Sequence, residues 1–99
     1  MEVLFTGPAE EQLKKIYCHY PESVAEELVE KILLRAEKLA HFADRGRIVE
    51  ELRFMDQGHR FVLQENYKII YRQLDGKIYV TDVFAMHQNP ESIIKRHED

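Results

Sequence analysis

The chain has a single cysteine, Cys18, so it can form no disulfide bond within itself. Disulfides are typical of oxidising compartments, and a lone cysteine fits the reducing cytoplasm. No apolar run approaches the roughly 18 to 20 residues that a membrane-spanning helix needs. The N-terminus has no basic segment followed by a long apolar one, which argues against a signal peptide. We therefore expect a cytoplasmic protein that makes no membrane contact.

Several catalytic and ligand-binding motifs are also missing. No glycine-rich phosphate loop is present, which argues against nucleotide hydrolysis of the usual kind. Ser23 and Ser92 stand in no nucleophile motif, and Cys18 lies in an amphipathic segment, so a nucleophilic triad has no support. A structural zinc site needs four ligands in recognisable pairs. We expect neither a metal nor a cofactor, because no such pairing is present among the five histidines, His19, His41, His59, His87 and His97.

The size and charge of the chain predict one acidic globular domain. Its 99 residues fit a single domain over 1–99, with 44% hydrophobic and 32% charged residues, which is ordinary for a globular protein. The formal net charge of −4 argues against a general nucleic-acid binder, because such proteins usually carry a basic bulk charge. The 14 lysines and arginines can still form a local patch while the 18 acidic residues lie elsewhere.

The first residues predict a strand followed by a helix. Val3, Leu4 and Phe5 favour a strand over residues 2–6. Thr6 is a plausible N-cap for a helix over roughly residues 8–20, with Gly7 and Pro8 at its start. That helix carries an apolar stripe at helical spacing, formed by Leu13, Ile16, Tyr17 and Tyr20.

A second, longer helix follows Pro21. Apolar residues keep helical spacing for about five turns, at Val24, Leu28, Ile32, Ala36, Leu39 and Ala43, widened by Leu33 and Phe42. Charged residues occupy the outer face, which we interpret as solvated. Gly46 suits a left-handed cap at the end of this helix. The connection between the helices is short, so they should form an antiparallel hairpin.

The second half of the chain predicts a meander. Three runs rich in β-branched and aromatic residues, at about 59–64, 67–73 and 77–85, are separated by Glu65-Asn66 and Asp75-Gly76, as in antiparallel hairpins. Residues 47–53 fit a brief strand or an ordered loop, 54–58 a turn, and 91–97 a helical turn. The predicted architecture is α+β: an N-terminal strand, an antiparallel helical hairpin and a three-stranded antiparallel meander. The first strand should take the remaining sheet edge, and the face opposite the helices should be wet.

Cations are predicted to gather on that wet face. It would carry Arg60, Lys68 and Arg72, while a short segment nearby is flanked by the three arginines Arg45, Arg47 and Arg53. Adjacent strands could combine these into a patch of roughly four to six charges that contacts phosphates or an acidic protein segment. The alternative is that they serve solubility and protect the sheet edge.

One combination of side chains would support catalysis. Metal-independent RNA cleavage needs a base, cations for the crowded phosphate charge and an acid for the leaving oxygen. Glu50 or Glu51, Arg60 and His87 could supply these roles. Sequence spacing leaves open whether they converge, and a histidine after a strand is also common as an ordinary turn residue.

Four segments together resemble the RelE/ParE superfamily of toxins from bacterial type II toxin–antitoxin modules. They are DRGR at 44–47, VEEL at 49–52, HRFVLQENYKIIYR at 59–72 and VTDVFAMHQNP at 80–90, and the resemblance covers nearly the whole chain. It implies a growth-inhibiting toxin of a plasmid-stabilisation type system. It also implies a cognate antitoxin that wraps the toxin and neutralises it.

The superfamily contains two kinds of toxin. One branch resembles ribosome-dependent nucleases that cut messenger RNA, and the other resembles inhibitors of DNA gyrase. Glu50 falls near a carboxylate of the YoeB-like nucleases and His87 near their strand-end histidine, but their strand arginine falls at Val62, with Arg60 the nearest substitute. This departure, the acidic charge and the long helical hairpin favour ParE-like gyrase poisoning. The alternatives are a RelE/YoeB-like endoribonuclease and an inactive antitoxin-binding module.

Overall fold

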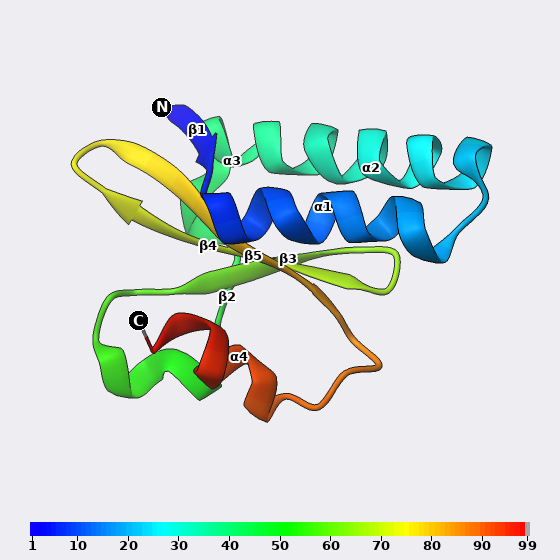
Figure 1. Cartoon of the computed structure of the whole chain (residues 1–99). Coiled ribbons are helices and arrows are strands. Elements are labelled where there is room, and N and C mark those ends of the chain that lie inside the picture. The colour runs from blue at the N-terminus through cyan, green and yellow to red at the C-terminus, as the bar shows by residue number, and fades with distance from the viewer. Residues whose placement is uncertain (99) are drawn as a thin grey trace.

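The structure, a computed structural model that describes residues 1–98, has three layers (Figure 1). Helices α1 and α2 lie on one face of a five-stranded sheet, and a smaller layer of α4 and a 3₁₀ helix lies on the other. The elements are β1 (Glu2–Phe5), α1 (Gly7–His19), α2 (Glu22–Glu37), α3 (Leu39–Phe42), η1 (Ala43–Arg45), β2 (Arg47–Ile48), η2 (Glu50–Met55), β3 (Arg60–Gln64), β4 (Tyr67–Leu74), β5 (Lys77–Ala85) and α4 (Glu91–His97). Within residues 1–98, no helix is long and apolar enough to span a membrane.

The sheet has the strand order β1-β5-β4-β3-β2. The predicted meander is confirmed, because β3, β4 and β5 pair antiparallel in sequence. The first strand takes the free edge, as expected, and runs parallel to β5 from Glu2–Lys77 to Phe5–Val80. Asp75 and Gly76 both have positive φ, at 52° and 76°, which gives a two-residue turn the twist that joins antiparallel strands.

The larger core lies between the helical hairpin and the sheet. Thr6 caps α1 as predicted, since its hydroxyl accepts a hydrogen bond of 3.3 Å from the Ala9 amide. Ile16 of α1 and Ile32 of α2 are buried against the sheet residues Ile69 and Val80. These contacts fix the hairpin across the strands.

The predicted helical stripes were partly wrong. Val24, Leu33, Phe42 and Tyr17 are 46, 39, 47 and 47% exposed. The buried face of α2 is instead completed by Ala25 and Val29. Small side chains let α2 approach its neighbours closely. The face of α2 that carries the alanines is therefore buried, and the face with larger side chains is exposed. The long helix also divides at Lys38, where α2 ends and α3 begins.

The opposite sheet face is covered more than predicted. A second core joins Leu52 of η2, Ile93 of α4 and the strand residues Ile70 and Phe84, all at most 1% exposed. The predicted 91–97 helical turn is thus a packed helix. α4 and η2 therefore cover the centre of this face.

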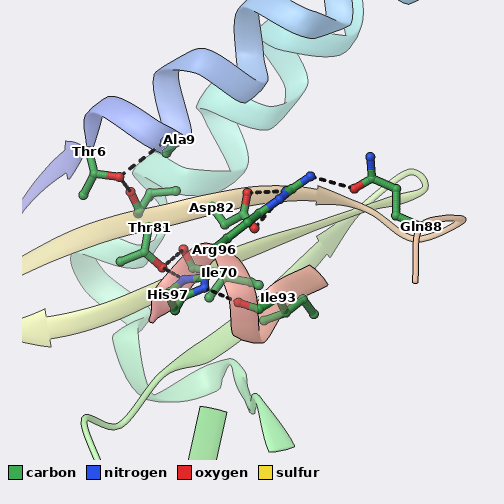
Figure 2. A network of polar contacts seen from close by, with 10 residues as sticks. Thr6, Ala9, Ile70, Thr81, Asp82, Gln88, Ile93, Arg96 and His97 are labelled. Atoms are coloured by element: carbon green, nitrogen blue, oxygen red, sulfur yellow. Dashed lines mark hydrogen bonds and ion pairs between the residues drawn. The ribbon is translucent and has the colours of Figure 1, made fainter. Parts of the chain in front are cut away.

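Polar contacts hold α4 against β5 (Figure 2). The Arg96 guanidinium donates to both oxygens of Asp82, at 2.8 and 3.0 Å, and to the Gln88 side-chain oxygen at 2.8 Å. The His97 ring lies 2.8 Å from the Thr81 hydroxyl and 2.8 Å from the Ile93 carbonyl. Asp82 is only 1% exposed, so its charge-assisted pair with Arg96 satisfies a buried carboxylate.

His59 makes stability depend on pH. It is 4% exposed, and its ring lies 5.2 Å from that of His97. Burial, with the nearby His97 and Arg72, lowers the pKa of His59 from 6.5 to about 4. Between these values the unfolded chain binds the extra proton, so folding stability falls as the pH is lowered through this window.

Between pH 7 and pH 4.5, we expect the unfolding free energy of the wild type to fall by about 2 to 3 kcal/mol more than that of His59→Leu. The leucine cannot titrate, so the difference between the two proteins isolates His59 from the carboxylates that also protonate. Urea unfolding at several pH values measures it. Parallel stability curves for the two proteins would contradict the assignment.

Candidate functional site

The segment that carries Arg45 and Arg47 is held to the sheet by Tyr71. The buried Tyr71 hydroxyl donates to the Ala43 carbonyl at 2.5 Å and accepts from the Gly46 amide at 3.1 Å. Burial raises the pKa of Tyr71, which keeps the hydroxyl protonated as a donor. The Arg60 guanidinium adds a hydrogen bond of 2.8 Å to the Gly46 carbonyl. Three hydrogen bonds therefore fix this turn.

Gly46 is required for a different reason from the one predicted. Its φ is −68°, so it is not a left-handed cap. A Cβ at this position would overlap the Tyr71 hydroxyl and lie 2.9 Å from the Cε1 atom of the same ring. The absence of a side chain is what lets the turn approach Tyr71 so closely.

Beside this turn lies a group of basic side chains that we call the cationic edge: Arg35, Arg45, Arg47 and Lys68. The three arginines line one hollow of 200 Å³. Arg47 and Lys68 line a neighbouring hollow of 550 Å³, together with Phe61 and the two carboxylates Glu50 and Glu51. The two hollows share Arg47 and Phe61, so they form one continuous surface at the β2–β3 side of the sheet.

Two aromatic rings support these charges. The Arg45 guanidinium carbon lies 4.2 Å from the centre of the Phe42 ring. The Lys68 amine lies 4.6 Å from the centre of the Phe61 ring. Both distances fall within the range of cation–π contacts, which explains why Phe42 remains exposed on the surface. The edge therefore presents charge on an apolar support.

Arg35 was missed by the sequence analysis, which assigned it to the solvated face of the second helix. It lies beside buried Ala36 and is itself half-buried. Arg35 lies at the margin of the apolar stripe of the helix, and this position could have indicated that it is not fully solvated. Residues at the margin face the neighbouring layer rather than bulk water.

The predicted single patch on the wet face is wrong for Arg60. Arg60 pairs directly with Tyr71, which packs in the core under the helices, and paired residues share one face. Lys68 and Arg72 lie on the α4 face instead, and Arg72 donates to the Gln57 side chain at 3.1 Å. Arg53 is exposed and forms two hydrogen bonds of 2.8 Å with Glu50.

The three candidate catalytic residues lie in different surroundings. Glu50 lines the larger hollow of the cationic edge. His87 lines another pocket, beside α1. Arg60 is directed to the Gly46 carbonyl, and Val62 is buried at 6% exposure. The structure thus does not bring Glu50, Arg60 and His87 into a common pocket.

Glu50 is also poorly suited to act as a base. The hydrogen bonds from Arg53 lower its pKa below the usual value, and a base is most effective when its pKa lies near the working pH. Within residues 1–98, no three histidine, cysteine, aspartate or glutamate side chains converge as a metal site would require.

Comparison with known proteins identifies the family. The family profile described as "ParE toxin of type II toxin-antitoxin system, parDE" matches residues 3–90. The chain belongs to the ParE toxin family. The predicted superfamily is confirmed, and membership implies a cognate antitoxin as partner. No curated protein matches the chain significantly.

A solved structure supports the ParE fold. It is described as "Chromosomal ParDE TA system from P. aeruginosa" and is 24% identical in sequence, with a TM-score of 0.72. The match covers 86% of this chain and 95% of that chain. The fold of this chain is therefore shared with that chain over most of the length of both.

We expect Gly46→Ala to lower the unfolding free energy by about 1 to 3 kcal/mol, because the added methyl must displace the Tyr71 ring. Gly7→Ala is the matched control, since a Cβ there meets nothing within 4 Å. Urea midpoints with unchanged slopes measure both changes. Equal stability of the two variants would show that Tyr71 and the turn are free to separate.

Proposed function

We propose that this ParE-family toxin inhibits growth by binding DNA gyrase rather than by cutting RNA. The observation that carries the proposal is the separation of Glu50, Arg60 and His87. A general acid and a general base must each lie within about 3 Å of the atoms they serve, directly or through one water. Groups that line different pockets do not meet that requirement.

The hydrogen bond that Arg60 forms within the protein supports the same proposal. Its guanidinium donates to the Gly46 carbonyl and so helps to hold the turn that bears Arg45 and Arg47. An arginine engaged in this way is a poor candidate for stabilising phosphate charge in a transition state. Val62, which lies where the nucleases carry an arginine, is buried among apolar residues of the core.

The cationic edge is the surface best suited to contact the target. Arg45 and Lys68 lie over aromatic rings. The three arginines line the smaller hollow, and Glu50 and Glu51 share the larger one with Arg47 and Lys68. Such a surface fits an acidic protein segment or the phosphates of protein-bound DNA. Both are chemically compatible with a complex of gyrase and DNA.

We expect His87→Ala to inhibit bacterial growth as strongly as the wild type. The His87 side chain lies outside the cationic edge and would not be needed if toxicity arises from binding there. Growth after induction, with sequencing of messenger RNA ends within minutes, measures the result. Loss of toxicity together with ribosome-positioned cleavage by the wild type would establish the endoribonuclease instead.

We expect the purified wild-type toxin to inhibit supercoiling by gyrase. Arg47→Gln, Lys68→Gln should require about tenfold more toxin for half inhibition, because two interface charges are lost. Lys14→Gln, Lys95→Gln removes the same charge from exposed positions that line neither hollow and should leave inhibition unchanged. Full gyrase activity at saturating wild-type toxin, or no growth inhibition on induction, would contradict the proposal.

A further inference from the structure

A second basic site lies away from the cationic edge. A pocket of 320 Å³ is formed where the C-terminal half of α1 approaches the end of β5 and the residues that follow it. We call it the α1 pocket. It is lined by Gln12, Lys15, Ile16, His19, Tyr20, Tyr67, Val83, Ala85, His87 and Gln88. Its volume lies at the lower end of the range for ligand-binding sites.

The ionisable nitrogen-containing side chains of the α1 pocket have no carboxylate beside them in its lining. The lining holds three basic side chains, Lys15, His19 and His87, and no carboxylate. This contrasts with the chain as a whole, whose formal net charge is −4. Anions therefore meet only positive or neutral groups here, and charge-assisted hydrogen bonds to them are strong.

Gln88 is oriented to donate. Its side-chain oxygen accepts from Arg96 at 2.8 Å, and Arg96 is itself held by Asp82. Figure 2 shows the Gln88 amide nitrogen directed away from Arg96. The pair between Arg96 of α4 and Asp82 of β5 thus helps to fix the Gln88 side chain, which lines the pocket.

The rest of the lining is apolar or aromatic. Ile16, Val83 and Ala85 contribute buried apolar surface. Burial, with the neighbouring Tyr20 hydroxyl, raises the pKa of Tyr67 to about 12, so its hydroxyl stays neutral. The α1 pocket therefore combines an apolar wall with cationic and neutral donors.

We propose that the α1 pocket binds one acidic side chain and an adjacent apolar side chain of a peptide segment of the antitoxin. The proposal rests on the toxin–antitoxin function, because that partner brings a peptide to this surface. It assigns Lys15, His19, His87 and Gln88 to the carboxylate and the apolar wall to the neighbouring residue.

The surroundings favour a short acidic peptide over a nucleic acid. Nucleic-acid binding requires contacts to many phosphates along an extended basic surface. Here the lining offers only three basic side chains, Lys15, His19 and His87, on a chain whose formal net charge is −4. A site of this size fits a single carboxylate better than a run of phosphates.

A titration of the full-length ¹⁵N-labelled toxin followed by NMR tests the proposal. The probe is acetyl-glutamyl-leucinamide, and its isosteric control is acetyl-glutaminyl-leucinamide. We expect saturable shifts at the pocket residues with the first peptide and about tenfold weaker binding of the second, the effect of one charge-assisted hydrogen bond. Equal binding of both peptides, or binding of neither, would overturn the proposal.

Two variants and one further probe locate the site. Lys15→Gln, His87→Gln should weaken binding of the acidic peptide about tenfold, whereas Lys14→Gln, His41→Gln removes the same residue types from exposed positions outside the pocket and should not. Tighter binding of inorganic phosphate than of the peptide would overturn the peptide assignment. Growth inhibition by the wild type is scored separately, so failure here leaves the toxin function standing.

Discussion

The hydroxyl of Tyr71 joins the two halves of the molecule. It is buried between the Ala43 carbonyl, at the end of the helical layer, and the Gly46 amide, at the start of β2. A buried donor or acceptor left without a partner costs about 1 to 3 kcal/mol, so neither side of this junction can separate freely. The position of Arg45 and Arg47, and with them the cationic edge, depends on this contact.

Both faces of the sheet are covered, and this limits where a functional site can lie. The helical hairpin buries one face, and η2 with α4 buries the centre of the other. Glu50 lies at the β2–β3 side of the sheet and His87 follows the end of β5. This arrangement places the two side chains in different pockets.

The local sequence signals predicted most of the fold. The turn Asp75-Gly76 and the cap Thr6 act through neighbouring backbone atoms, so their effect is visible in the sequence itself. The sequence did not indicate whether Val24 or Ala25 would lie on the buried face of α2. Both fit helical spacing, and only the close packing of α2 against its neighbours decides between them.

The candidate site was less predictable because it depends on contacts between distant residues. Arg60 was placed with Lys68 because both lie on strands of the meander, yet its direct pairing with Tyr71 puts it on the helix face. The close approach of Gly46 to Tyr71 likewise joins residues 25 positions apart. Contacts between residues so far apart in the chain produce no periodic pattern in the sequence.

The two basic sites of the chain contrast with its formal net charge of −4. The cationic edge and the α1 pocket are local clusters of basic side chains. Charge–charge attraction between exposed groups falls with salt over about 10 Å at moderate ionic strength. The aromatic supports at Phe42 and Phe61 and the apolar wall of the pocket are less sensitive to salt. Affinity at each site should therefore come from charge and apolar contact together.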